Sequence, residues 1–238
     1  MAMQNTLLGS RAPQLTSSSS LKVRRHTCHQ RLHTAAKASL NQIFNPVPAY
    51  RRIAADLAGA EIYEAVRKGS SDFQRVSALV DTLLESNLPF KEKLLGGGPW
   101  QVVYTRGPLL WQGFTVAGNA LSKHRIGRSK NKASQEYNPA DRSVINRGEV
   151  LGDCVRVSAC GSYEPVGETK TMPVLVKADI EGGELNAFGR SLPLPIRGSG
   201  YVSIAYLDEC LRVLQDRRGG VAVQMREDVL QQLLAANG

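Results

Sequence analysis

Two charged side chains, Asp208 and Arg212, lie four positions apart near the end of the chain, between stretches of alternating apolar residues. General acid–base catalysis by a carboxylate needs a group within hydrogen-bond reach with which it exchanges a proton. An arginine stays protonated at any ordinary pH, and no histidine is near in the sequence. We therefore interpret the pair as structural: an ion pair, or a turn-capping Asp208, would fix the register of a hairpin that joins strands at 201–207 and 211–215.

Other catalytic reagents are scarce in this chain. His124 is the only histidine after residue 37, and it lies in the basic sequence SKHRIGRSKNK without an orienting partner nearby. There is no HExxH motif and no Cys/His cluster with zinc spacing, and the glycine-rich LLGGGPW lacks the Lys-Ser/Thr of a phosphate loop. The sequence therefore predicts a protein that is not an enzyme and uses no cofactor or metal.

Most of the basic charge of the 238-residue chain lies at its N-terminus. The formal net charge is +9, yet residues 1–55 contain no Asp or Glu, and residues 1–37 are rich in Ser and Arg. This composition predicts an organelle transit peptide over residues 1–37, with a disordered basic arm that stays attached as the alternative. The rest of the chain has 24 basic and 21 acidic residues, so its net charge is small.

Three cysteines lie beyond the predicted transit peptide. Cys154 and Cys160 share a predicted strand, where six residues at about 3.3 Å each place them too far apart for a disulfide. We expect these two and Cys210 to be buried as small apolar residues, with a redox thiol pair that involves Cys210 as the alternative. No apolar run approaches the ~20 residues of a membrane-spanning helix.

Two helices are predicted in a helical lead-in over residues 38–96. In the first, Ile53, Leu57 and Ala60 recur at helical spacing. The second follows the N-cap sequence SSD, and the two are expected to form a hairpin or one bent helix. The expected apolar face of the second helix comprises Phe73, Val76, Val80 and Leu83 or Leu84.

From Trp100 onward the apolar pattern has a period of two, which is typical of strands. Eight to ten short strands are predicted between residues 99 and 226, with turns at NPAD, YEPVGE, EGGE, RGSG and RRGG. Because no helical crossovers separate them, the strands must be mostly antiparallel. A sheet of this many strands usually curls or closes, so we predict an antiparallel β-barrel over 97–226 and a short C-terminal helix over 227–238.

Four aromatic residues lie close together where the predicted barrel begins: Trp100, Tyr104, Trp111 and Phe114. They are either ordinary core residues or the lining of an apolar ligand cavity. Alternation places Trp100 and Tyr104 on one face of the first strand and Val103 on the other. The sequence PLLWQGF also suits an exposed tip that faces a membrane. We take the four aromatic residues as the candidate lipid-binding residues.

Residues 122–132 form a loop with five Lys or Arg and no acid. Such blocks are either self-repelling surface loops or interaction segments. Anionic lipid headgroups attract each basic residue by up to ~1 kcal/mol. Binders of single-stranded nucleic acid interleave aromatic residues with such charge, and none occurs here before Tyr137, so a membrane surface is the preferred partner and nucleic acid is disfavoured. The candidate membrane-contact residues are Lys123, Arg125, Arg128, Lys130 and Lys132.

Three segments together resemble the plastid lipid-associated protein family, also called fibrillins or plastoglobulins. These segments are FQRVSALVDTLLESNLPF, LLGGGPWQVVYTRGPLLWQ and YVSIAYLDECLRVLQDRRGGVAVQM, and the resemblance runs from about residue 61 to residue 225. Trp100, Tyr104 and Thr105 match the first strand, and the phrase from Tyr206 to Arg212 matches the closing hairpin.

The resemblance implies a mainly β fold with a helical N-terminal segment, in which the strands form an antiparallel, lipocalin-like β-barrel. It also implies a transit peptide for chloroplast import, association with thylakoids or plastoglobules, and binding or sheltering of hydrophobic lipids or isoprenoids without catalysis. Two alternatives remain: a structural coat protein of plastid lipid droplets with a filled barrel, and an RNA-binding plastid protein that uses the loop 122–132. An open apolar interior favours the carrier, and a packed one favours the coat.

Overall fold

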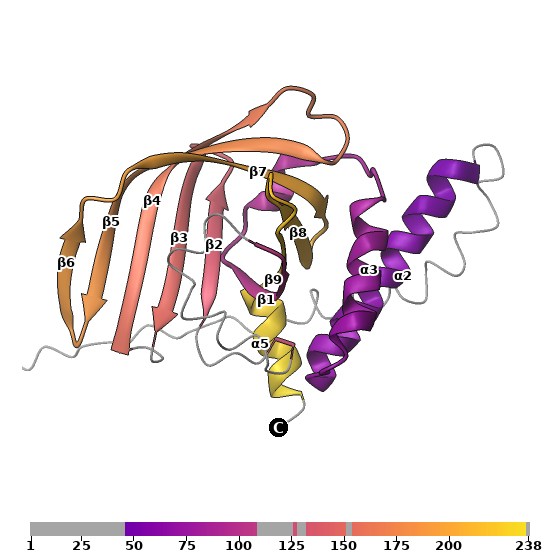
Figure 1. The fold of residues 1–238 in the computed structure, drawn as a ribbon, viewed down its shortest axis with the longest axis horizontal. Helices are drawn as coiled ribbons and strands as arrows, with labels where there is room; N and C mark the ends of the chain where they lie inside the picture. The colour runs from indigo at the N-terminus through magenta and orange to yellow at the C-terminus, as the bar shows by residue number, and fades with distance from the viewer. Residues whose placement is uncertain (1–45, 109–125, 128–131, 151–153, 237–238) are drawn as a thin grey trace, which may run out of the picture. The chain divides into compact units, whose positions relative to one another are not determined.

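The strands form one antiparallel sheet, and within the described residues no helix lies between consecutive strands (Figure 1). The computed structural model of the chain describes residues 46–108, 126–127, 132–150 and 154–236. Nine strands pair within these residues, which confirms the predicted antiparallel arrangement. The strands are β1 (Trp100–Arg106), β2 (Ala133–Asn138), β3 (Ser143–Val150), β4 (Val155–Val166), β5 (Val174–Ala187), β6 (Arg190–Leu194), β7 (Gly198–Leu207), β8 (Leu211–Gln215) and β9 (Val221–Arg226).

Eight of these strands form a ring. In the order β4-β3-β2-β1-β9-β8-β7-β5 each strand pairs with the next, and β5 pairs in turn with β4. The short strand β6 extends the sheet from β5. Because paired residues on neighbouring strands point to the same side of a sheet, this ring has an inner and an outer face.

The prediction of a turn at EGGE (residues 181–184) is wrong, because these residues lie inside β5. Gly182 pairs with Cys160 and Gly183 pairs with Ala159, next to a register shift between β4 and β5. Glycines inside a strand often mark such a bulge, since they tolerate the close approach of another backbone. A Cβ on Gly161, across the shift, would lie 1.9 Å from the carbonyl oxygen of Asp179. The two strands therefore continue through the glycines and bend instead of turning.

The two N-terminal helices, α2 (Pro46–Lys68) and α3 (Phe73–Leu84), lie side by side as a hairpin (Figure 1). Helix α3 begins as predicted: the side chain of Asp72 accepts the backbone N–H of Arg75 at 3.0 Å. Its buried residues, Val76, Val80 and Leu83, are among those expected from the sequence.

Helix α2 buries a different face from the one predicted. Leu57 is exposed, whereas Ala55, Ala58, Ile62 and Val66 are buried. Small residues allow a helix to approach its neighbours closely, and a Cβ on Gly59 would come within 3.7 Å of the Tyr206 hydroxyl. Helix α2 therefore packs through the face that allows close approach, and not through the face that carries Leu57.

Buried apolar residues form one cluster on each face of the ring. The outer cluster joins α2, α3 and the C-terminal helix α5 (Glu227–Ala235) to β1, β7, β8 and β9. The inner cluster includes Trp100, Tyr137 and Tyr163, together with residues of the 3-10 helix η1 (Glu92–Leu95). The described residues all belong to one compact unit, Phe44–Gly238. Both faces of the sheet thus contribute to the core, and the inner face alone is enclosed by strands.

Candidate functional site

The inner face of the ring carries a fully buried arginine, Arg212 on β8. Its Nε donates to Gln224 Oε1 at 2.7 Å, and its Nη2 donates to Gln135 Oε1 at 3.1 Å and also to Gln224 Oε1. Gln135 in turn donates through Nε2 to Asn146 Oδ1 at 2.7 Å. Arginine is almost never fully buried unless it is paired with a charge. Here neutral amide oxygens hold the guanidinium.

Two aromatic rings flank this guanidinium. The Arg212 Cζ lies 5.0 Å from the ring centroid of Trp100 and 4.9 Å from that of Tyr137. Tyr137 packs edge to face on Tyr163, with ring centroids 4.7 Å apart. Cation–π contacts of this kind partly offset the loss of hydration. The arginine, two glutamines and two aromatic rings thus form one contiguous group inside the ring.

The charge of Arg212 has no acidic counterpart in the described part of the chain, where no Asp or Glu pairs with it. Removal from water lowers the pKa of Arg212 to about 10, so the side chain remains cationic at neutral pH. Among the described residues, its Nη1 has no hydrogen-bond partner, and neither has Gln224 Nε2 or the Tyr137 hydroxyl. Burial also raises the pKa of Tyr137, which keeps that hydroxyl protonated. The buried guanidinium and two side chains that contact it therefore each have unused hydrogen-bonding capacity.

Helix η1 lies across the end of the ring nearest to Arg212. The indole Nε1 of Trp100 donates to the carbonyl of Leu95 at 2.9 Å, and the Tyr163 hydroxyl donates to Glu92 Oε1 at 3.2 Å. These bonds reach η1 from two different strands, and Leu95 is fully buried beneath them. Hydrogen bonds and apolar packing thus close this end.

A second arginine, Arg226, strengthens the same closure. Its Nη1 donates to the carbonyl of Gly96 at 3.2 Å, and its Nη2 donates to that of Gly97. Gly97 has a positive φ of +92°, and a Cβ there would lie 2.7 Å from the Arg226 Nη1. Only glycine combines this backbone conformation with this contact at low cost. The glycine-rich segment therefore provides the carbonyl groups that bind Arg226.

Away from the closed end, the inner face changes to small and apolar residues. Ala133 and Ala222 lie two residues from Gln135 and Gln224 on the same strands, and therefore point to the same inner side. Several of these residues, such as Val102 and Val157, are partly exposed, whereas the residues of the closed end are buried. The small or apolar inner residues of this half are Val102, Ala133, Gly148, Val157, Ala159 and Ala222.

The structure separates Trp100 from Tyr104, which were expected to share a face. A bulge between Val102 and Tyr104 adds one residue to β1 and reverses its alternation. Val103 and Tyr104 both join the outer cluster, and Tyr104 stacks on Phe73 of α3 with ring centroids 6.3 Å apart. Trp100 faces the interior of the ring, whereas Tyr104 faces outward and does not line the interior. The other two candidates, Trp111 and Phe114, lie outside the described residues.

Asp208 and Arg212 have separate roles. The Asp208 Oδ1 accepts the backbone N–H groups of Cys210 and Leu211, each at 2.7 Å, and its Oδ2 accepts the Tyr206 hydroxyl at 2.8 Å. Of the two structural roles considered from the sequence, Asp208 has the turn-capping one. Loss of water around this carboxyl raises its pKa. Arg212 pairs with the inner-face glutamines instead.

Sequence reasoning missed the polar residues around Arg212. Gln224 interrupts the apolar run VAVQM, and Gln135 precedes Tyr137 by two positions on the same strand face. A glutamine within an apolar strand, as at Gln224, is a usable signal, because a buried amide needs a polar partner. That signal predicts a buried polar group, but the sequence could not identify Arg212 as the partner.

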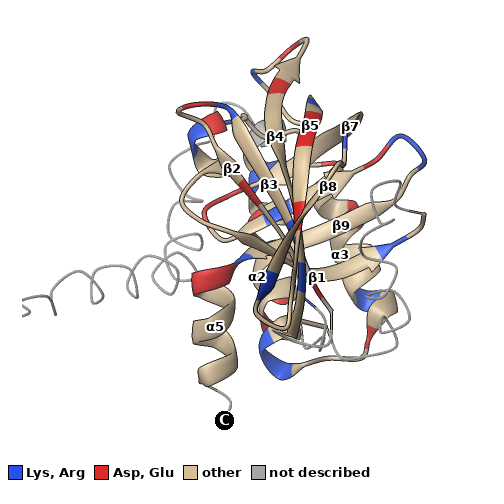
Figure 2. Ribbon diagram, turned by 90° about the vertical axis from the view of Figure 1, so that its left-hand side faces the viewer, with Lys and Arg blue, Asp and Glu red and all other residues tan. Residues whose placement is uncertain are grey.

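Of the basic loop 122–132, the structure describes three residues. The backbone N–H of Ile126 donates to the carbonyl of Ser70 at 3.0 Å, and Ile126 is buried in the outer cluster. The Nζ of Lys132 lies 4.0 Å from Glu149 Oε2. In the described chain, segments with Lys or Arg are interspersed with segments with Asp or Glu (Figure 2). The other candidate membrane-contact residues, Lys123, Arg125, Arg128 and Lys130, lie outside the described residues, as does His124.

The expectation that the cysteines are buried is wrong. Cys154 and Cys160 are exposed, and Cys210 is half-buried. Cys160 lies between the inner-facing Ala159 and Gly161, so alternation turns it outward. Among the described residues, no group of His, Cys, Asp and Glu gathers as a metal site, and none of the helices combines the length and apolar character needed to cross a bilayer.

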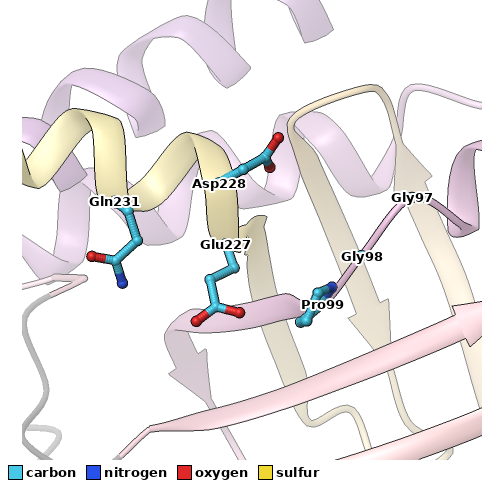
Figure 3. A pocket seen from close by; sticks show the side chains of 6 residues that line it. All are labelled: Gly97, Gly98, Pro99, Glu227, Asp228 and Gln231. Atoms are coloured by element: carbon cyan, nitrogen blue, oxygen red, sulfur yellow. The ribbon is translucent and has the colours of Figure 1, made fainter. Parts of the chain in front are cut away.

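A hollow outside the ring lies between the glycine-rich segment and the first turn of α5 (Figure 3). Its polar wall includes Glu227 and Asp228, and Arg226 Nε donates to Asp228 Oδ1 at 3.4 Å. Such an acidic surface does not suit an apolar ligand. The residues that line it are Gly97, Gly98, Pro99, Glu227, Asp228 and Gln231.

Comparisons with known proteins find no matching family model, no matching curated protein and no matching solved structure.

Proposed function

We propose that the ring is a lipocalin-like β-barrel and that the protein binds or shelters a hydrophobic lipid or isoprenoid on its inner face. One observation carries this proposal: large buried side chains fill the end beneath η1, whereas small and apolar side chains line the other half, where Val102, Ala133 and Val157 are partly exposed. An apolar ligand buried there gains about 25 cal/mol per Å² of surface removed from water. The role is binding and not catalysis.

The location that we propose is a plastid. Support comes from the acid-free, Ser- and Arg-rich residues 1–37, which have the composition of a transit peptide. It also comes from the segments around Trp100 and from Tyr206 to Arg212, which resemble the plastid lipid-associated proteins. We place the mature protein at the surface of thylakoids or plastoglobules, where the loop 122–132 would approach anionic headgroups.

A structural coat on plastid lipid droplets is the second candidate. The observation that favours it is the complete packing of the closed half, where Trp100 and Tyr137 are at most 1% exposed. RNA binding has less support, because Lys132 lies near Glu149 and the described charges of both signs are interspersed (Figure 2).

Two adjacent residues of β2 provide a matched test of binding on the inner face. Ala133 points inward and Ser134 outward, and both are partly exposed. In the full chain, Ala133→Phe fills the inner face and is expected to weaken binding of the methyl ester of cis-parinaric acid, an apolar fluorescent probe, about tenfold or more. Ser134→Phe should leave the affinity unchanged.

Fluorescence titration measures both affinities, and native mass spectrometry of the protein from its own organelle should show a co-purifying lipid. A wild-type chain that binds neither this ester nor the free acid, or equal affinities in the two variants, would contradict binding inside the ring. Such results would instead favour the coat role.

A further inference from the structure

We propose that the ligand carries a carboxylate and that Arg212, together with Tyr137 and Gln224, binds this carboxylate inside the ring. The inference rests on the proposed function and adds the chemical class of the ligand. The expected ligand is a long-chain acid, whose apolar tail extends along the small residues of the inner face. Neutral lipids of the same length would bind less tightly.

The donors around Arg212 are only partly used by the protein. A guanidinium has five N–H groups. Those on Nε and Nη2 point to Gln224 Oε1 and Gln135 Oε1, while Nη1 has no acceptor within the part of the chain that the structure describes. In the same part of the chain, Gln224 Nε2 and the Tyr137 hydroxyl are also buried donors without a partner. Each such group costs free energy when it is buried and unbonded, so an acceptor-rich ligand is favoured here.

The charge balance points to an anion. Arg212 is fully buried, and no Asp or Glu within the described residues neutralises it. Glutamine oxygens and the rings of Trp100 and Tyr137 offset part of the cost of burying this charge, but they bring no negative charge. For packing alone, an apolar side chain of similar volume would serve as well or better. A buried cation with open donors is therefore better explained by a bound anion.

The size and charge of a carboxylate fit this group better than those of a phosphate. A carboxylate has one negative charge and two oxygens, which match one cation with donors on Nη1, Gln224 Nε2 and Tyr137. A phosphate headgroup brings more charge and more oxygens than these donors satisfy. Arg226, the other arginine near Trp100, donates to the carbonyls of Gly96 and Gly97. It is thus engaged in closing the end of the ring.

The inner residues on one side of Arg212 are small. On the side of η1, Trp100, Tyr163 and Leu95 are buried and packed. On the other side, the residues next to Gln135 and Gln224 on the inner face are Ala133 and Ala222. A ligand whose head reaches Arg212 would therefore place its tail along the alanines and toward the partly exposed half of the ring.

The test compares two probes that differ only at the head: cis-parinaric acid and its methyl ester, titrated into the full chain near neutral pH. The wild-type chain should bind the acid about tenfold more tightly than the ester, as expected for a charge-assisted hydrogen bond. Arg212→Met should bind both probes with the affinity that the wild type has for the ester. Arg217→Met is the matched control, because Arg217 also stacks on an aromatic ring, that of Tyr201, but is exposed.

Each outcome decides between the two proposals. If the wild type binds acid and ester equally, or if Arg212→Met keeps the preference for the acid, the carboxylate site is overturned while lipid binding stands. If the wild type binds neither probe, the proposed function itself fails. Circular dichroism checks the fold of Arg212→Met; if that variant is unfolded, Tyr137→Phe replaces it. Loss of a hydroxyl that has no partner among the described residues should then reduce the preference severalfold, and an unchanged preference would overturn the site.

Discussion

The guanidinium carbon of Arg212 lies 5.0 Å from the centre of the Trp100 ring, although the two residues are far apart in the sequence. Trp100 is the first residue of β1, and Arg212 lies on β8, near the end of the chain. Strand β9, whose Gln224 accepts a hydrogen bond from Arg212, lies between these two strands and pairs with both. The contact therefore exists only after three strands have assembled side by side. It brings a buried charge to the one end of the ring that η1 covers.

Replacing Arg212 should affect stability less than replacing its acceptor. In Arg212→Met, an apolar chain of similar length remains between Trp100 and Tyr137, and we expect the free energy of unfolding to stay within about 1–2 kcal/mol of the wild type. In Gln224→Leu, the buried cation loses its main acceptor, and we expect a loss of about 3 kcal/mol. Urea denaturation measures both. A larger loss in Arg212→Met than in Gln224→Leu would show that the arginine is needed for folding.

Tyr104 should matter for stability and not for ligand affinity. It packs on Phe73 in the outer cluster, so Tyr104→Ala removes a buried ring between β1 and α3 and should cost about 3 kcal/mol. Binding of the parinaric ester should change less than about twofold, because Tyr104 is not on the inner face. Thermal unfolding measures the loss of stability, and fluorescence titration measures the affinity for the ester. A strong loss of affinity in a folded variant would return Tyr104 to the candidate binding residues.

Asp208 should make the fold less stable as pH rises. Its folded pKa is raised by burial, so just above the ordinary pKa of an aspartate, about 4, the unfolded chain releases the proton while the folded chain retains it. The stability contributed by this group is present at lower pH and lost as pH rises through the folded pKa. Asp208→Asn keeps an oxygen that accepts the N–H groups of Cys210 and Leu211 and removes the titration.

The measurement is the difference in unfolding free energy between the wild type and Asp208→Asn, from urea denaturation at a series of pH values. This difference should shift in favour of the variant as pH increases from acid to neutral. A flat difference, or a shift toward the wild type, is incompatible with a raised pKa at Asp208.

Asp81 should make the fold more stable as pH rises, which is the opposite of the dependence expected for Asp208. Arg106 donates to Asp81 through Nη1 at 3.1 Å and also through Nη2, and this hydrogen bonding lowers the pKa of Asp81. Its contribution to stability is therefore present above the ordinary pKa and lost as pH falls through the lowered one. Because Asp81 is half exposed, we expect no more than about 1 kcal/mol. Asp81→Asn should be less stable than the wild type at neutral pH and equal to it in strong acid; a deficit that persists in acid would contradict this.

Features that depend on a few neighbouring residues were predictable. The cap at Asp72, the apolar face of α3, and the hairpin that joins 201–207 to 211–215 all follow from local spacing. The antiparallel order follows as well, because the short connections between successive strands from β2 to β9 leave no other pairing.

The sequence by itself determined the elements and the alternation within them, because helix caps and strand periodicity act over a few residues. Only the tertiary structure decided the ring-closing pairing of β4 with β5, the face to which Tyr104 points, and the environment of Arg212. One extra residue at a bulge reverses every side chain after it, and a buried charge takes partners from strands far apart in the chain. Both effects arise when strands meet, so spacing along the sequence does not contain them.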